Sequence, residues 1–200
     1  GGYTNQCAAL STGEIIYAQA EYKRQMKRLR RAQRRLDRKQ KGSTNRVKQK
    51  RRVAQLHERT AAVRRDFLHK LTHRLTCENQ ALAVEDLNVK GMMVKPAAKP
   101  DPERPGAFLP NGASRKRGLA RSLASASLGE FFRQLEYKCA WRGVALLKVG
   151  RWEPSSKRCS CCGEINESLT LADRRWQCPA CGAELHRDIN AAVNIAARAA

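Results

Sequence analysis

Four cysteines near the end of the chain have the spacing of a metal site. Cys159 and Cys162 form one pair separated by two residues, and fifteen residues later Cys178 and Cys181 form a second such pair. A glycine follows each pair directly, which allows the backbone to bend around a metal ion. Four thiolates in this pattern are typical of a closed, tetrahedral zinc site with no open position for catalysis. We therefore expect a structural zinc ribbon, although eight cysteines could also suggest a disulfide scaffold.

Two further residues near this set could bind a metal. Cys161 lies inside the first pair and would break its two-residue gap, so we leave it as a non-ligand. His186 lies five residues beyond Cys181 and could in principle be a ligand, but four cysteines already complete the coordination shell. We assign His186 to the start of the following helix. A ribbon of this size has no core of its own, so loss of the metal should unfold the segment.

Two carboxylates have a setting that suits magnesium. Glu85 ends the apolar run 81–84, and Asp188 begins a segment of small residues just after the cysteine cluster. Carboxylates on two rigid elements can converge on a pair of magnesium ions, which activate water and stabilise the leaving oxygen in phosphodiester hydrolysis. From position alone a simpler interpretation is favoured, with Asp188 as a helix N-cap and Glu85 as a surface residue beside a turn.

The chain carries a large excess of positive charge. Its 40 Lys and Arg against 18 Asp and Glu give a net charge of +22 in 200 residues. A charge of this size indicates a polyanionic partner, of which nucleic acid is the leading candidate and an anionic membrane surface the weaker one. No apolar stretch reaches the about 18 residues of a transmembrane helix, and no secretion signal is visible at the start.

The basic residues concentrate between residues 21 and 75, where apolar residues recur at helical spacing on both sides of a break at 41–44. The pattern predicts a helical hairpin, with Gly42 at a helix end and Ser43 or Thr44 as the next N-cap. Acidic partners at i,i+4 are too few to balance the bases, so a phosphate-binding face is favoured over a merely solvated one. The bases assigned to nucleic-acid contact here are Arg24, Lys27, Arg28, Arg31, Arg35, Arg51 and Arg52.

The remaining pattern predicts strands and helices that carry these groups. Short strands are expected in the apolar runs 7–10, 15–18, 81–84 and 144–149. The first two form a β-hairpin through Thr12–Gly13, and the third is a buried strand that delivers Glu85. A Pro-rich stretch over 95–117 predicts a mobile loop. Helices are expected near 122–142 and over 188–197.

In this order the motifs resemble the TnpB-like family, long labelled transposases of bacterial insertion sequences and related to type V CRISPR nucleases. The segments that carry the resemblance are 41–46, 65–70, 84–89 with Met92, 154–157, the two cysteine pairs and 187–195. The resemblance implies an α/β fold: a partial RNase H-like (RuvC-like) domain with an inserted basic helical hairpin and a zinc ribbon before the last helix.

The family architecture implies a division of the chain into five parts. These are 1–19 as a remnant of the first RuvC-like strands, 20–76 as the basic helical hairpin, 77–157 as RuvC-like core with the mobile loop 95–117, 158–183 as the zinc ribbon and 184–200 as the last RuvC-like helix.

The family's activity is implied as well: a transposon-encoded, RNA-guided DNA endonuclease that hydrolyses phosphodiesters with magnesium. DNA and a guide RNA are then the partners, with no membrane, at the nucleoid in the bacterial cytoplasm. The second and third catalytic carboxylates map to Glu85 and Asp188 as magnesium ligands, and the zinc ligands map to the two cysteine pairs. Arg187, beside the third carboxylate, matches a basic residue that would contact the scissile phosphate.

The first carboxylate of the family, an Asp on the first strand, has no match in this sequence. No acidic residue precedes Glu14, which lies in the turn after that strand and is a poor substitute. The family's N-terminal nucleic-acid-binding part is not matched either, so we expect the C-terminal part of a family member. Three interpretations stay open: the nuclease part of an endonuclease, a catalytically inactive, truncated nucleic-acid-binding module, and a transposase that joins DNA strands with the same carboxylates.

Overall fold

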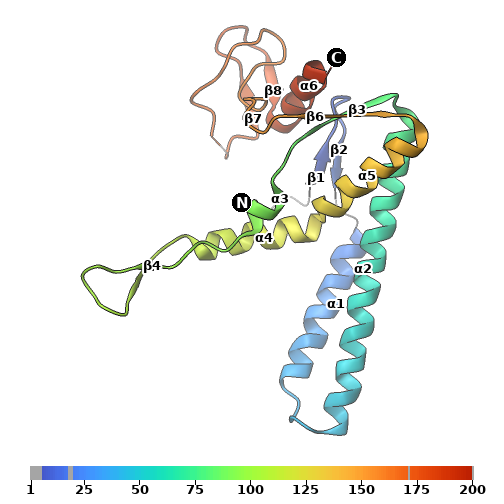
Figure 1. Cartoon of the computed structure of the whole chain (residues 1–200), viewed down its shortest axis with the longest axis vertical. Coiled ribbons are helices and arrows are strands. Elements are labelled where there is room, and N and C mark those ends of the chain that lie inside the picture. The colour runs from blue at the N-terminus through green and yellow to red at the C-terminus, as the bar shows by residue number, and fades with distance from the viewer. Residues whose placement is uncertain (1–5, 18–19, 171, 200) are drawn as a thin grey trace.

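The structure is a computed structural model that describes residues 6–17, 20–170 and 172–199 (Figure 1). Its elements are β1 (Gln6–Ala9), β2 (Ile15–Tyr17), α1 (Ala20–Asp37), α2 (Thr44–Glu78), β3 (Ala81–Glu85), α3 (Val89–Met93), β4 (Lys99–Pro100), β5 (Phe108–Leu109), α4 (Ala113–Ala126), α5 (Leu128–Arg142), β6 (Ala145–Val149), β7 (Arg175–Gln177), β8 (Glu184–His186) and α6 (Arg187–Ala199). The helical pair α1–α2 extends from one end, an arm with α3, α4 and β4 projects sideways, and the C-terminal segment packs at the other end.

The helical hairpin that the periodicity predicts is confirmed. Its two helices pack along a narrow seam of buried Leu29, Ala32 and Val53. Ser43 is the N-cap of α2, where its Oγ accepts from the Arg46 N–H at 3.2 Å. The Arg46 guanidinium donates to two carbonyl oxygens at the end of α1, at 2.9 Å each, which satisfies acceptors that a helix end leaves open.

The first hairpin is also confirmed, and β1 pairs with β2 in antiparallel register. Strand β3 pairs in parallel with β6, so that Glu85 stands opposite Val149. Strand β3 is only partly buried, because in the described part of the chain β6 is its one strand neighbour. The strands there form four separate two-stranded ladders: β1–β2, β3–β6, β4–β5 and β7–β8.

The main core lies between helices α2 and α5 and the strands β2, β3 and β6. Leu135 of α5 is 1% exposed and packs with Leu71 and Leu75 of α2 and Ile16 of β2. A buried polar contact joins the same helices, since Lys138 Nζ donates to the His69 carbonyl oxygen at 2.8 Å and to Thr72 Oγ1 at 2.7 Å. Burial lowers the pKa of Lys138. Strand β3 packs against this core, which therefore positions the strand.

Two expectations for the middle of the chain were wrong. The helix expected near 122–142 is two helices, since α4 begins at Ala113 and ends where Ser127 adopts a left-handed φ of +50°. The Asn111 side chain accepts from the Ala113 N–H at 3.1 Å and so starts α4 early. The stretch 95–117 was expected to be a loop throughout. It instead contains the short β4–β5 pair and the beginning of α4.

None of the helices in the described ranges combines the length and apolar character that crossing a bilayer requires.

Leu135→Ala should lower the free energy of unfolding by about 2–5 kcal/mol, because it removes a fully enclosed side chain and leaves a cavity. Urea unfolding followed by far-UV circular dichroism measures the change. Leu119→Ala is the matched control, since Leu119 on α4 is 41% exposed and should change stability by less than about 0.5 kcal/mol. Equal effects of the two substitutions would contradict the core described here.

Candidate metal centres

The four cysteines expected to bind zinc meet at one point. Their Sγ atoms all lie within 4.8 Å of one another. The Cys159 and Cys181 sulfurs are 3.7 Å apart, and those of Cys162 and Cys178 are 3.6 Å apart. Thiolates bound to a tetrahedral zinc at about 2.3 Å lie about 3.8 Å from one another. The cluster is therefore consistent with zinc in both size and chemistry.

The two cysteine pairs are built as equivalent turns. In each, the N–H of the first cysteine donates to the carbonyl oxygen five residues later, at 2.7 and 2.9 Å. The N–H of the glycine after the pair donates back to the first cysteine's carbonyl oxygen, at 2.9 Å in both turns. Gly163 and Gly182 have φ of +81° and +73°, which side chains other than glycine rarely adopt. The local sequence thus shapes both turns to present two sulfurs inward.

The two additional candidates lie outside the cluster. The Cys161 N–H donates to Cys159 Sγ at 3.4 Å, while the Cys161 thiol is not among the converging ligands. His186 ends β8, and its buried Nδ1 has no hydrogen-bond partner in the described part of the chain. Burial raises the pKa of the Cys159 thiol, but the backbone N–H groups of Cys162 and Cys161 oppose this and bring it down to about 6.

The ribbon has little apolar support apart from these cysteines. Its buried cluster contains Leu169 and Trp176 beside two of the cysteines, and β7 and β8 are three residues each. Strand β8, which the sequence assigned to the last helix segment, pairs with β7 in antiparallel register. The ribbon fold therefore extends to His186, directly before α6.

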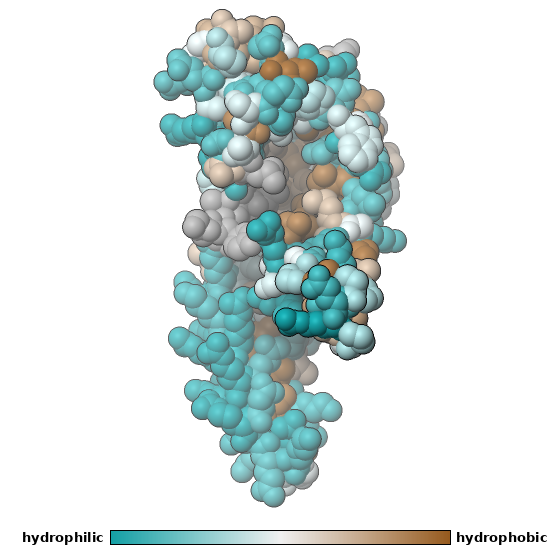
Figure 2. Space-filling model, turned by 90° about the vertical axis from the view of Figure 1, so that its left-hand side faces the viewer, coloured by the Kyte–Doolittle hydropathy of each residue, from teal (hydrophilic) through white to brown (hydrophobic). Residues whose placement is uncertain are grey.

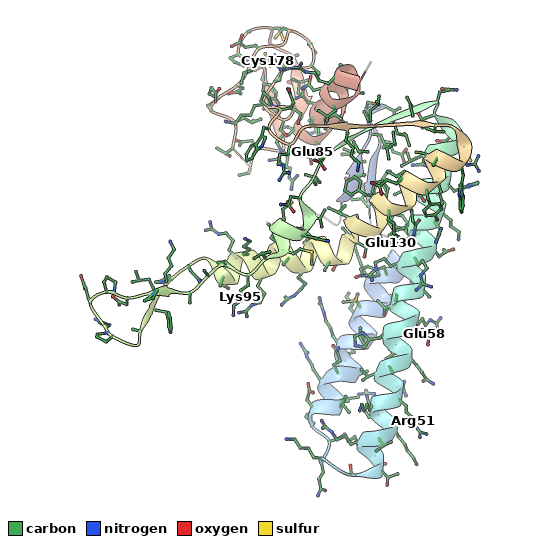
Figure 3. All side chains as sticks on the ribbon, in the orientation of Figure 1. Arg51, Glu58, Glu85, Lys95, Glu130 and Cys178 are labelled. Atoms are coloured by element: carbon green, nitrogen blue, oxygen red, sulfur yellow. The ribbon has the colours of Figure 1, made fainter. Side chains whose placement is uncertain are left out.

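Glu85 lies at the carboxyl end of β3, as the sequence predicted. Figure 3 shows this end of the strand beside the ribbon that carries Cys178. The side chain is half-buried, and burial raises the pKa of its carboxyl group. No hydrogen bond or ion pair to this carboxylate occurs among the described residues. Glu85 is therefore a partly desolvated acid that lacks a compensating cation there.

Asp188 lies in the first turn of α6, one residue inside the helix, so the interpretation of it as an N-cap is wrong. Its Oδ2 accepts from Arg174 Nη1 at 2.8 Å, and its Oδ1 accepts from Arg187 Nε and Nη2 at 3.3 Å each. Arg174 was not singled out from the sequence, because its role depends on the ribbon bringing it back to α6. Helix α6 packs against β3 and β6, which brings the helix of Asp188 to the strand of Glu85.

The bases predicted to contact nucleic acid fall into two groups. All seven of those on α1 and α2 are exposed, and Figure 2 shows a mostly hydrophilic surface over the hairpin. Among them Arg24 forms an ion pair with Glu21 at 3.1 Å. Arg187 differs, since its side chain is only 11% exposed and contacts Asp188. Figure 3 shows Arg51 of the hairpin well away from Glu85, whereas Arg187 lies beside Asp188.

Comparisons with known proteins found two matching family models and several curated relatives. Residues 4–95 match a family described as "Probable transposase", and residues 129–195 match "Cas12f1-like, TNB domain". A "Putative RNA-guided DNA endonuclease" of Streptomyces pristinaespiralis is 44% identical over 94% of this chain and 41% of its own length. The Escherichia coli K12 "Putative RNA-guided DNA endonuclease InsQ" is 36% identical over 95% of this chain and 46% of its own length.

A solved Cas12f1–sgRNA–target DNA complex is similar in fold, with a TM-score of 0.53 at 19% identity over 91% of this chain and 34% of that chain. The chain belongs to the TnpB-like family of transposases and RNA-guided endonucleases. It spans less than half the length of the two curated relatives described above.

Purified protein should contain one zinc ion per chain, and removing the zinc with a strong chelator should unfold the ribbon while α1 and α2 stay helical. Cys178→Ser should abolish zinc retention, because Cys178 is a buried member of the cluster. Cys161→Ser is the matched control and should retain the metal. Elemental analysis and circular dichroism measure both effects, and full zinc content in Cys178→Ser would contradict the assignment.

Proposed function

We propose that this chain is the nuclease part of a transposon-encoded, RNA-guided DNA endonuclease, with a RuvC-like (RNase H-like) core and a zinc ribbon. The observation that carries the proposal is the packing of α6, with Asp188 in its first turn, against β3, which ends at Glu85. The two elements that carry these carboxylates therefore pack against one another. The names of the curated relatives support hydrolysis of DNA as the reaction.

The two carboxylates fit magnesium in their donor chemistry. Magnesium prefers hard oxygen ligands and is commonly held by one or two carboxylates. Glu85 is partly desolvated without a cation among the described residues, and Asp188 already attracts two guanidinium groups. When bound, magnesium would supply an activated water nucleophile and would stabilise the departing oxygen of the cleaved phosphodiester.

The arginines around Asp188 have a separate role in this proposal. Arg187 reaches both Asp188 Oδ1 and, through Nη1 at 3.4 Å, the carbonyl oxygen of Thr170. A guanidinium fixed in this way presents positive charge next to the carboxylate without free rotation of a long side chain. Arg187 would therefore contact the scissile phosphate, and the ion pair with Arg174 would hold the Asp188 side chain in place.

The proposed partners are DNA and a guide RNA, with zinc bound by the four cysteines. The exposed bases of the hairpin provide a surface for phosphates, whose contacts release counterions from nucleic acid. The similar solved structure holds Cas12f1 with an sgRNA and target DNA, which supports the same classes of partner. A protein with these partners would act at the nucleoid in the bacterial cytoplasm.

A second candidate function is nucleic-acid binding without cleavage. One observation favours it: Glu14, the first acidic residue of the sequence, is engaged elsewhere. Its two carboxylate oxygens accept from Arg74 Nη2 at 3.0 and 3.1 Å. This carboxylate is therefore held by α2 and does not replace the first catalytic Asp that the family resemblance implies.

Glu85→Gln and Asp188→Asn should each lower magnesium-dependent cleavage of guide-matched DNA by about 100-fold or more, because each removes a charge that stabilises the transition state. Glu58→Gln, an exposed change on α2, is the control and should leave the rate unchanged. Gel-based cleavage assays measure the rates. Cleavage that persists in both carboxylate variants would contradict the assignment of Glu85 and Asp188 as catalytic residues, and RNA binding without any wild-type cleavage would favour the second candidate.

Replacing Arg51 and Arg52 together by Ala should weaken RNA binding and reduce its salt dependence. Each lost phosphate contact should lower the slope of log K against log salt concentration by about 0.7 for a single strand. Fluorescence anisotropy at several salt concentrations measures the slope. Arg133→Ala is the control, since its guanidinium is already paired with Glu130 at 2.7 Å. An unchanged slope in the double variant would show that the hairpin face does not contact RNA.

A further inference from the structure

Two asparagines of α6, Asn190 and Asn194, hold the chain that leads into the first cysteine turn. Asn190 is 2% exposed. Its Nδ2 donates to the Arg158 carbonyl oxygen at 2.7 Å, and its Oδ1 accepts from the Ser160 N–H at 2.9 Å. Asn194 Nδ2 donates to the carbonyl oxygens of Ser155 and Arg158, at 2.8 and 2.7 Å. Both sides of Cys159 are thereby tied to α6.

These hydrogen bonds are the directional part of the contact between α6 and the ribbon. Most other residues in the middle of α6 are small or aliphatic, and alanine contacts alone would allow the helix to slide or rotate. An amide that both donates and accepts fixes the helix along its axis and around it. Asn190 and Asn194 are four residues apart and share one face, while Asp188 lies about 200° around the helix from Asn190.

The same helix therefore has one face fixed to the ribbon and another that carries a candidate metal ligand. If α6 rotated about its axis, the asparagines and Asp188 would turn through the same angle. The ribbon also reaches Asp188 directly, because Arg174 lies just before β7 and donates to Asp188 Oδ2. The position of Asp188 thus depends on the ribbon at two separate points.

We propose that Asn190 and Asn194 are positioning residues, which transmit the geometry of the cysteine turn to α6 and so place Asp188 for a divalent cation. The proposal rests on the proposed function, because it takes Asp188 as a ligand of that cation. It connects the two metal sites: zinc orders the turn around Cys159, the asparagines hold α6 to this turn, and α6 carries Asp188. Removing a partner that orients a metal ligand typically lowers metal affinity by about 10- to 100-fold.

The test uses the zinc-loaded chain with Mn²⁺ as the probe, and electron paramagnetic resonance of free Mn²⁺ gives its affinity. Asn190→Ala and Asn194→Ala, each measured at one zinc per chain, should bind Mn²⁺ about tenfold or more weakly. Asn166→Ala is the matched control, since among the described residues its side chain accepts only from Ser168 within its own ribbon turn. This control should bind Mn²⁺ as the unmodified chain does.

A second comparison asks whether the asparagines act through Asp188. In the Asp188→Asn background, Asn190→Ala and Asn194→Ala should cause no further loss of Mn²⁺ affinity. The same loss in both backgrounds, or unchanged affinity at full zinc content, would overturn the proposal. A variant that cannot be brought to one zinc per chain would place the role of its asparagine in the zinc site and would also count against it. Equal Mn²⁺ affinity of the unmodified chain and Asp188→Asn would instead refute the proposed function.

Discussion

The convergence of four cysteine sulfurs within 4.8 Å is the constraint on which the C-terminal part of this protein depends. The ribbon buries few apolar side chains, and its two strands are three residues each, so its own packing is too small to hold the segment. A bound metal takes the place of a core in such segments. Because Arg174 and the chain around Cys159 both contact α6, the order that a bound metal would impose on the ribbon would extend to Asp188.

Glu85 depends on a different part of the molecule. The start of β3 packs over the core formed by α2, α5 and β2, where Leu135 is enclosed by Leu71 and Leu75. Glu85 is therefore positioned by apolar burial, whereas Asp188 is positioned by the ribbon. The elements that carry the two residues are joined by the packing of α6 on β3 and β6. A site assembled in this way is expected to require both the core and the ribbon to be intact.

The features that the sequence predicted well are those with local signals. The apolar seam of the hairpin follows from helical spacing, and the cysteine cluster follows from two short pairs, each with a glycine behind it. The left-handed Ser127 that divides α4 from α5 has no such signal, since serine rarely adopts this φ. Arg174 and the hydrogen-bonding roles of Asn190 and Asn194 could not be predicted, because their partners are set by tertiary packing. The four-residue spacing of Asn190 and Asn194 indicates only that they share one helix face, not what they contact.

In the proposed function, zinc in the ribbon and a divalent cation at Glu85 and Asp188 belong to one connected structure. This connection can be tested by a crystal structure of the zinc-loaded chain soaked in Mn²⁺, with diffraction recorded at the zinc and manganese absorption edges. We expect a zinc peak among the four sulfurs and a manganese peak in contact with both carboxylates. A manganese peak that contacts neither Glu85 nor Asp188, or a cysteine cluster without zinc, would contradict it.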